Sequence, residues 1–470
     1  MKKYICLLLC FIWCYSAQAQ YIFQKSGGNQ LFFVGITKAI DSGYLLSGGF
    51  GTTTLSILKI DELGDTVWTK SYDGPNGGNI ETVKLYDSSY ISFGELSSFS
   101  VCADMDDMYM MKIKLNGDTI WTKHYGTCHG DMPHNILKAP NNGYYIYGTE
   151  MINPPIAGGI TIIRLSEMGD TLWTRFINMS PNPINLANLT QENFASAATP
   201  DGGILISGMV MDSTITPRHS WIMKIDSNGT IQWHKFLDYP PSNIIKNIFT
   251  TASGYLLAGL CTLHNPANYV TSEFGTMMVK IDFNGNIIWG KVYENIISGA
   301  DPERAFSGVL QSTMITNDGG VFVAGVRQLR PGYQGNYHSL VSFKTDSAGN
   351  VLWLKKHNID AVDVMPMRVC QTRDNGFLIT AYRNTDSTQT AYNNNILVKI
   401  DSLGNSCNDS TLTMQVVDFT NQIVTSDTIV PLVGFYPVVV GHSPFTIGTG
   451  VNYKDVCSGN VGVKEYQHPT

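Results

Sequence analysis

The stretch KIDELGDTVWTK at residues 59–70 decides the fold, because the same pattern recurs along the chain. The tryptophans of successive complete copies are 52 to 64 residues apart. Self-similarity at a period of this length is typical of propellers and solenoids. A shortened copy, KIDSLGNSCND, covers residues 399–409, and five further complete copies end at Lys123, Arg175, Lys235, Lys291 and Lys355.

A second, apolar phrase precedes each copy, as in GYLLSG at 43–48, GYYIYG at 143–148 and GYLLAG at 254–259. Each unit therefore reads as four strands, with the Asp-x-x-Gly segment as a short hairpin turn whose Gly takes a positive φ. One such sheet cannot bury both of its faces, whereas seven sheets packed face to face around an axis can. The sequence predicts an all-β, seven-bladed β-propeller with four-stranded blades.

The seventh unit lacks its fourth strand, because no W-x-K follows Gly404. The missing phrase stands at the other end of the chain, where QYIFQKS at 20–26 matches VWTKSY at 67–72. We expect this N-terminal strand to complete the last blade and close the ring, which removes an open edge. The alternative, an open solenoid, would require polar caps that neither end provides.

The first 19 residues read as a secretory signal peptide, with Lys2 and Lys3 before an apolar run and Ala17-Gln18-Ala19 as the cleavage site. The apolar run is about 12 residues long, too short for a membrane-spanning helix of about 20. We therefore expect a secreted protein, extracellular or at the cell surface, without a transmembrane segment. The predicted organisation is signal peptide at 1–19, propeller at 20–410, and a small irregular or β C-terminal segment at 411–470, either an appendage or a linker.

Charge and motifs narrow the function. The chain has 31 Lys and Arg against 38 Asp and Glu, a net charge of -7, which argues against nucleic acid as a partner. Gly-x-Ser-x-Gly, His-Glu-x-x-His and phosphate-loop patterns are absent from the sequence. We expect no cofactor and a monomer.

The repeat resembles a known family. The combined pattern DGGYxxAG…KxDxxGxxxWxK is similar to the propeller repeats of exported proteins in Gram-negative bacteria that use type IX secretion, and the resemblance covers residues 20 to 410. Such proteins often end in a C-terminal sorting domain, and VGVKEY at 461–466 looks like the linker that precedes one. The resemblance implies a propeller fold and export, and it implies no particular activity.

Connections of variable length on one face of the ring are the expected place for a binding site. One such loop carries aromatic and basic side chains that suit a sugar or a carboxylate, although an ordinary exposed loop has the same composition. These candidate ligand-binding residues are Arg327, Arg330, Tyr333, Tyr337 and His338.

A second loop gathers imidazole and carboxylate groups, the ligand types of a metal site, with Asp107 and His124 as neighbours. The alternative is a polar loop held by a disulfide. The candidate metal ligands are His129, Asp131 and His134. The Asp-x-x-Gly turns also suggest calcium, but they lack the closing Glu of an EF-hand, so we interpret them as structural hairpins.

Six of the nine cysteines lie beyond the signal peptide. In an oxidising compartment Cys102 and Cys128, in neighbouring loops of one repeat, are one candidate disulfide pair. Cys407 and Cys457, which flank the C-terminal segment, are the other. Cys261 and Cys370 lie in or beside apolar strands and are predicted to be buried thiols.

Two functions remain open. The first is a non-catalytic exported scaffold whose variable loop face binds a protein or a glycan, with a pure adhesion scaffold as a variant. The second is a secreted polysaccharide hydrolase or lyase built on the same propeller. Catalysis is less favoured, because folding explains the repeats and the sequence shows no catalytic constellation.

Overall fold

The computed structural model describes residues 20–461, except for gaps at 28–30, 51–53, 74–75, 85–86, 97–106, 127–129, 152–158, 179–194, 212–217, 238–242, 263–273, 295–311, 329–337, 362, 385–393, 420–422, 425–437, 442–445 and 448–453. The predicted signal peptide lies outside the described residues. Every regular element in the described part is a strand, and none of it is a helix long and apolar enough to cross a membrane.

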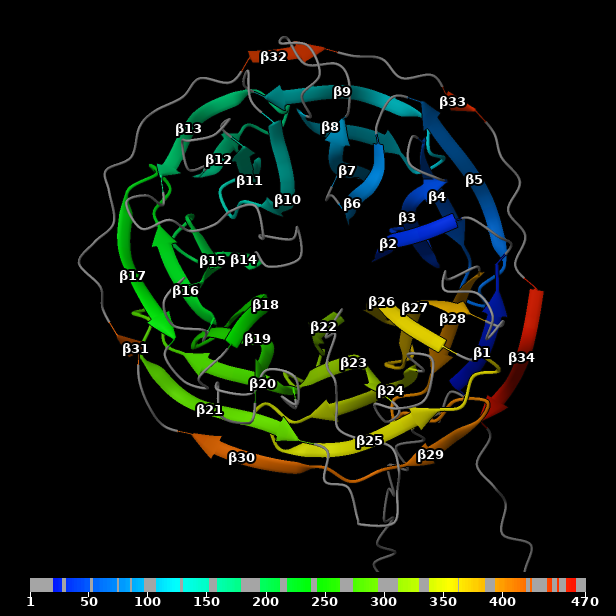
Figure 1. Cartoon of the computed structure of the whole chain (residues 1–470). Coiled ribbons are helices and arrows are strands. Elements are labelled where there is room, and N and C mark those ends of the chain that lie inside the picture. Colours follow the sequence, from blue (N-terminus) through cyan, green and yellow to red (C-terminus); the bar gives the residue numbers. More distant parts are fainter. Residues whose placement is uncertain are drawn as a thin grey trace, which may run out of the picture.

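Seven antiparallel sheets surround one axis, and in six of them the four blade strands run in sequence order from the centre outward (Figure 1). The strands of blades 1 to 3 are β2 (Leu31–Lys38), β3 (Tyr44–Phe50), β4 (Thr54–Ile60) and β5 (Thr66–Asp73), then β6 (Asn76–Lys84), β7 (Ser89–Leu96), β8 (Asp107–Lys114) and β9 (Thr119–Gly126), then β10 (Gly130–Lys138), β11 (Tyr144–Met151), β12 (Gly159–Leu165) and β13 (Thr171–Asn178).

Blades 4 to 6 repeat this arrangement. Their strands are β14 (Ala195–Ala198), β15 (Ile204–Met211), β16 (Arg218–Ile225) and β17 (Ile231–Leu237), then β18 (Asn243–Thr251), β19 (Gly254–Thr262), β20 (Phe274–Ile281) and β21 (Ile287–Glu294), then β22 (Ser312–Ile315), β23 (Val321–Gln328), β24 (His338–Thr345) and β25 (Val351–His357). The seven four-stranded sheets confirm the predicted propeller.

Blade 7 is built from both ends of the chain. Its inner strands are β26 (Asp363–Gln371), β27 (Phe377–Asn384) and β28 (Asn394–Ile400), and its fourth strand is β1 (Gln20–Ser26). Phe23 lies opposite Lys399 in this pairing. The predicted closure of the last blade by the N-terminal strand is therefore confirmed.

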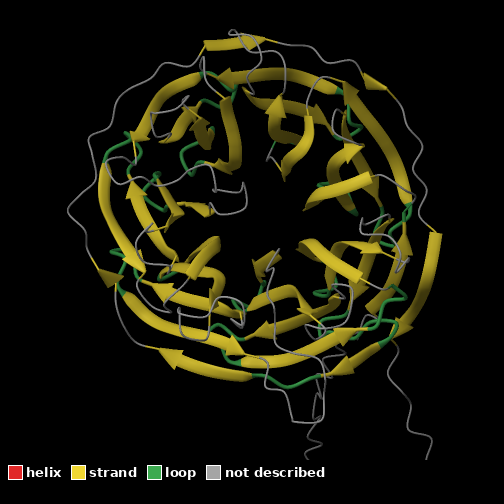
Figure 2. Ribbon diagram, in the orientation of Figure 1, coloured by secondary structure: helices red, strands yellow, loops and turns green. Residues whose placement is uncertain are grey.

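The C-terminal segment forms short strands on the outer edges of the blades, visible as an outer ring in Figure 2. We call residues 409–461 the belt. Its strands β29 (Asp409–Thr411), β30 (Gln415–Phe419), β31 (Ile423–Val424), β32 (Val438–Gly441), β33 (Thr446–Ile447) and β34 (Lys454–Val461) join blades 6, 5, 4, 2, 1 and 7 in turn. The sequence left open an appendage or a linker, whereas the structure shows edge strands spread around the propeller, beginning two residues before the expected boundary.

The core lies between the blades, because the middle strands bury side chains on both faces. All seven residues of β12 are buried, as expected for a strand between two neighbouring sheets. The core clusters accordingly mix residues of adjacent blades, such as Tyr145 and Ile162 of blade 3 with Ile206 and Met223 of blade 4.

The Asp-x-x-Gly segments are hairpin turns, as predicted. Asp61 Oδ1 accepts hydrogen bonds from the backbone N–H groups of Leu63 at 2.9 Å and Asp65 at 2.8 Å, and Gly64 has φ of 80°. The carboxylate thus holds the turn together through hydrogen bonds to its own backbone, as in an Asx-turn. The same pattern recurs at Asp226, Asp282, Asp346 and Asp401.

The repeat tryptophans lie at the junctions between blades, and they are only partly buried. Trp68 of blade 1 packs on Gly117 in the turn of blade 2, where a Cβ would lie 3.0 Å from the indole ring. Lys70 forms an ion pair with Asp118 of the same turn. The phrase that recurs in the sequence therefore encodes contact with the next blade. Equivalent ring-to-glycine contacts join Trp121 to Gly169, Trp233 to Gly285, Trp289 to Gly349 and Trp353 to Gly404.

Candidate functional site

The two faces of the ring differ in their connections. Those that join the first to the second strand and the third to the fourth strand of a blade contain two to five residues. They define the turn face. The connections between the second and third strands and between blades contain two to 17 residues and define the loop face. The expected division of short and variable connections is therefore present, and the long connections all lie on the loop face.

The innermost strands carry a β-bulge at equivalent positions in blades 1, 3, 5 and 7. The extra residue is Val34, His134, Lys246 or Met367, each placed between two paired neighbours. A bulge interrupts the alternation of side chains and turns one of them in a new direction. In blades 3 and 5 the bulged residues are polar or basic and stand on the wall nearest the axis.

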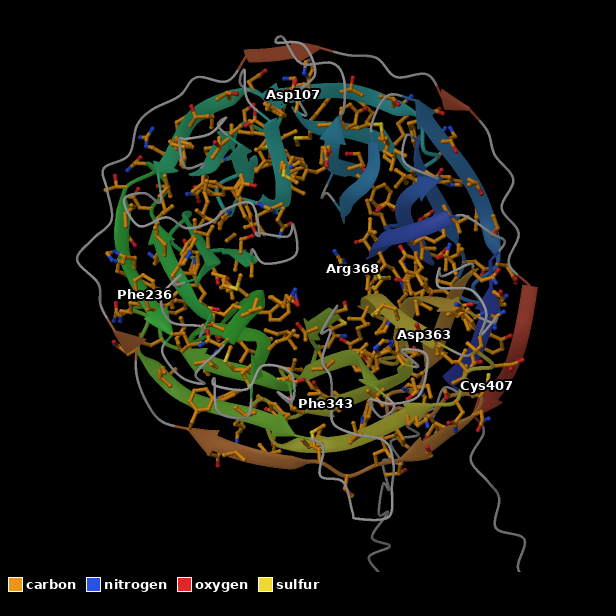
Figure 3. All side chains as sticks on the ribbon, in the orientation of Figure 1. Asp107, Phe236, Phe343, Asp363, Arg368 and Cys407 are labelled. Atoms are coloured by element: carbon orange, nitrogen blue, oxygen red, sulfur yellow. The ribbon has the colours of Figure 1, made fainter. Side chains whose placement is uncertain are left out.

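Side chains next to the bulges link neighbouring blades at the same level. Asn135 Nδ2 donates to Ser196 Oγ at 3.2 Å, and Thr313 Oγ1 donates to Asn247 Oδ1 at 2.7 Å. In blade 7 this position is Arg368, which Figure 3 shows on the inner wall beside the central opening. Arg368 Nη1 donates to the Met367 carbonyl at 2.9 Å, and its guanidinium places a positive charge on the inner wall of a chain whose net charge is negative.

Of the predicted ligand-binding residues, His338 has a described environment. Its Nδ1 lies 2.9 Å from Asp363 Oδ1, which also accepts a hydrogen bond from the His338 backbone N–H at 2.9 Å. The two side chains are 11% and 15% exposed and join blades 6 and 7 at the loop face. Figure 3 labels Asp363. The contact fixes the orientation of the imidazole.

The other members of that group are not placed. Arg330, Tyr333 and Tyr337 lie outside the described residues, and of Arg327 the structure gives the backbone, opposite Ser339. Whether these side chains gather around His338 therefore stays a prediction.

The candidate metal ligands are placed only in part. His129 lies outside the described residues, Asp131 is buried near the start of β10, and His134 Nε2 lies 3.1 Å from Thr149 Oγ1. Among the residues that the structure describes, no three His, Cys, Asp or Glu side chains are grouped to hold a metal ion. The metal site at His129, Asp131 and His134 thus also stays a prediction.

Asp107 and His124, neighbours of this group in the sequence, do meet. His124 Nδ1 lies 3.1 Å from Asp107 Oδ2, and both side chains are buried. Asp107, labelled in Figure 3, is the first residue of β8 in blade 2. Gly126 leaves the space that the Asp107 carboxylate occupies. The pair joins β8 to β9 within one blade.

Sequence reasoning missed two partners. Asp363 carries no signal beyond its place at the start of an inner strand. His357 stands four residues after Trp353, where blades 1, 2 and 5 carry a tyrosine, and its Nε2 lies 2.7 Å from Ser342 Oγ. Burial lowers the pKa of His357 to about 4, so the ring is neutral at pH 7. Comparison of the repeat copies would have marked this position as buried.

The cysteines divide as expected where they are described. Cys261 and Cys370 are buried free thiols, which confirms the prediction. Cys407 is disulfide-bonded. Cys102 and Cys128 lie outside the described residues, and Cys457 is placed by its backbone, opposite Gln24 of β1.

No protein-family model and no curated protein matches the chain. Among solved structures it is similar to a protein of unknown function from Dyadobacter fermentans, with a TM-score of 0.38 and 10% identity over 68% of this chain and 94% of that one. It is also similar to a mutant apocarotenoid oxygenase from Synechocystis (TM-score 0.34, 11% identity, 81% and 74% covered) and a glycosyl hydrolase from Bacteroides ovatus (0.29, 8%, 73% and 89%). Likenesses this distant carry no argument about function, and the seven sheets themselves establish the propeller scaffold.

Proposed function

We propose that the protein is an exported, non-catalytic propeller whose loop face binds an extracellular protein or a glycan. The observation that carries the proposal is the contrast in connection length between the faces. Lengthening a surface connection costs little free energy, whereas the strands that anchor it must stay fixed. A rigid ring with one varied face is the arrangement that protein scaffolds use to present a binding surface.

The inner wall of the ring and the rim of the loop face carry polar side chains that could contact a ligand. Arg368 offers a guanidinium to carboxylate or hydroxyl groups of a ligand near the axis. The His338–Asp363 pair at the rim of blades 6 and 7 offers an imidazole held in one orientation. These groups suit an acidic or hydroxyl-rich partner, and they are compatible with either a glycan or an acidic protein segment.

A thermal-shift screen of the secreted chain against polysaccharides, oligosaccharides, calcium, zinc and a chelator tests the proposal. A ligand at 100 times its Kd adds about 2.7 kcal/mol to the folded state and raises the melting temperature. The bound ligand should then be lost when the 17-residue connection at 295–311 is shortened to five residues. A matched control changes the turn face, by Leu63→Ser, and should leave binding intact. Binding lost equally in both variants, or kept in both, would contradict a loop-face site.

The second candidate is a polysaccharide hydrolase or lyase. The observation that favours it is the His338–Asp363 contact, since a carboxylate that orients an imidazole is an arrangement used in general acid–base catalysis. A His338→Gln variant separates the two functions. Loss of turnover with retained glycan binding would identify an enzyme, whereas absence of turnover in the unmodified protein supports the binding scaffold.

A further inference from the structure

The belt follows one direction around the propeller. Cys407 comes directly after the last turn of blade 7, residues 401–405. From there the described belt strands join blades 6, 5, 4, 2 and 1, and finally β34 returns to blade 7 (Figure 1). The segment therefore begins and ends at the same blade after one circuit of the ring.

Specific contacts hold the belt to its blades. Asp418 of β30 lies 2.6 Å from Lys291, and Asp409 of β29 lies 3.0 Å from Lys355. In blades 1 and 2 the equivalent lysine pairs with an aspartate of the next turn, but the turns of blades 6 and 7 carry Asn350 and Asn405 there. The belt thus supplies the acidic partner that those turns lack.

An apolar contact adds to the ion pairs. Phe419 lies over Gly290, at the position directly after a repeat tryptophan, and a Cβ there would collide with the phenyl ring. Phe419 is 8% exposed. The glycine makes room for a belt side chain, so the belt is an integral layer of the fold in blade 5.

The cysteines place a covalent bond at the ends of this circuit. Cys407 is disulfide-bonded, whereas Cys261 and Cys370 are free. Cys457 lies on β34, the outermost strand of the blade that Cys407 follows. Cys102 and Cys128 belong to connections that start from strands of blade 2, and blade 1 separates blade 2 from blade 7. The remaining cysteines precede Gln20, in the predicted signal peptide.

We propose that Cys407 bonds to Cys457 and that the disulfide closes the belt into a covalent hoop around the propeller. The folded ring then lies inside a closed loop of its own chain. Formation of the bond requires a disulfide oxidant such as oxidised glutathione. One cysteine thiolate attacks the oxidant and releases a thiol, and the second thiolate displaces the remaining thiol, so that two thiols are oxidised and one disulfide is reduced.

The hoop opposes unfolding in a way that an ordinary disulfide does not. Blades 1, 2, 4, 5 and 6, whose outer edges the described belt strands join, cannot separate outward while the closed chain surrounds them, because the belt would have to lengthen or leave these edges first. The hoop therefore acts mainly on the rate of unfolding, and only when both the disulfide and the belt are intact.

Peptide mapping of the oxidised, unmodified protein tests the pairing. We expect one cross-linked pair of peptides that contain Cys407 and Cys457, which separates on reduction. Cys407 linked to Cys102, Cys128 or a cysteine before Gln20 would overturn the proposal. No variant is needed, so a failure to fold cannot obscure the result.

Unfolding rates test the hoop itself. A protease site inserted between Phe419 and Ile423 allows the belt of the folded, oxidised protein to be cut while the disulfide remains. We expect the uncut oxidised protein to unfold in guanidinium chloride at least about tenfold more slowly than the reduced protein. The cut oxidised protein should match the reduced one. A cut at the same kind of site within 179–194, outside the belt, is the control and should preserve slow unfolding. If the belt-cut oxidised protein still unfolds slowly, the disulfide stabilises only its own surroundings and the belt does not act as a hoop. If the uncut protein unfolds at the same rate before and after reduction, the disulfide does not slow unfolding at all. Either result would overturn the proposal.

Discussion

The junction between blades 7 and 1 and the junction between blades 1 and 2 are built alike from different parts of the chain. In the first, Phe23 packs on Gly64 and Lys25 lies 2.5 Å from Asp65. In the second, Trp68 packs on Gly117 and Lys70 pairs with Asp118. A strand from the N-terminus thus reproduces a contact that elsewhere comes from within a continuous blade.

The difference lies in how deeply each contact is buried. Phe23 is fully buried and Lys25 is 2% exposed, because β34 runs along the whole of β1. At the second junction the belt strand β33 pairs with only Ser71 and Tyr72, and Trp68 stays partly exposed. The junction whose outer strand is not continuous in sequence with the rest of its blade is therefore the better covered one. Four sets of variants test this contrast.

Deletion of residues 20–27 should remove the junction between blades 7 and 1 and have the largest effect. It removes the fourth strand of blade 7 and the partner of β34, so we expect a loss of more than about 5 kcal/mol in the free energy of unfolding, or failure to fold. Thermal melts followed by circular dichroism measure the effect. Addition of the synthetic 20–27 peptide should raise the melting temperature again, and an unchanged melting temperature after deletion would contradict closure by β1.

Truncation of the equivalent aromatic side chains, Phe23 and Trp68, compares the stability that each junction gains from its ring. We expect Phe23→Ala to cost about 3–5 kcal/mol, as for a fully buried aromatic side chain, and Trp68→Ala to cost less, about 2 kcal/mol, because part of that ring already contacts water. Urea unfolding of both variants gives the comparison. A larger loss at Trp68 would show that burial by β34 does not strengthen the first junction.

The residue four positions after the repeat tryptophan differs between blades, and the pH dependence of stability tests the effect of this difference. At the second junction it is Tyr72, whose hydroxyl donates to the carbonyl of Gly117, and in blade 6 it is His357. The pKa of His357 is about 4 in the folded protein and about 6.5 when unfolded, so below pH 6.5 the unfolded chain takes up the proton first. Stability should be unaffected by this group above pH 6.5 and fall by about 3 kcal/mol between pH 6.5 and 4.

His357→Phe should flatten that part of the pH profile, measured by urea unfolding at successive pH values. His234→Gln in blade 4, where the side chain is only partly buried, serves as the control. An unchanged pH profile in His357→Phe would show that another group is responsible.

The smallest effect is expected at the ion pairs. Lys25→Met and Lys70→Met remove equivalent lysines, whose partners Asp65 and Asp118 are 65% and 49% exposed. Pairs with a solvated carboxylate contribute little, so each melting temperature should change by less than about 2 °C. A large loss for Lys25→Met alone would indicate that the buried lysine stem, and not its charge, stabilises the first junction.

Most of the fold was predictable from the sequence, because every blade repeats the same contacts. Six copies with a tryptophan and the shortened copy at 399–409 predicted seven blades, and the likeness of residues 20–26 to 67–72 predicted the closure. The belt was not predictable in its form. Its strands have two to eight residues, and their partners on six blades are set by edges that exist only after the ring has formed. A sequence signal was present in Asp409 and Asp418, which match lysines whose own turns carry asparagine.

The site was predictable by its face but not by its contacts. Connection lengths can be counted in the sequence, and they identify the loop face. The meeting of His338 with Asp363 depends on two blades whose contact residues are 25 positions apart along the chain. The bulges at His134 and Lys246 arise from strand register, which a single strand does not reveal.

The pairing of β1 with β28 also governs how the protein can be made. The strand that leaves the ribosome first finds its partner at residues 394–400, so blade 7 cannot exist until nearly the whole chain has been synthesised. Before that point the blades form at most an open arc with exposed strand edges. Completion of the ring is therefore a late event in the folding of the newly made chain.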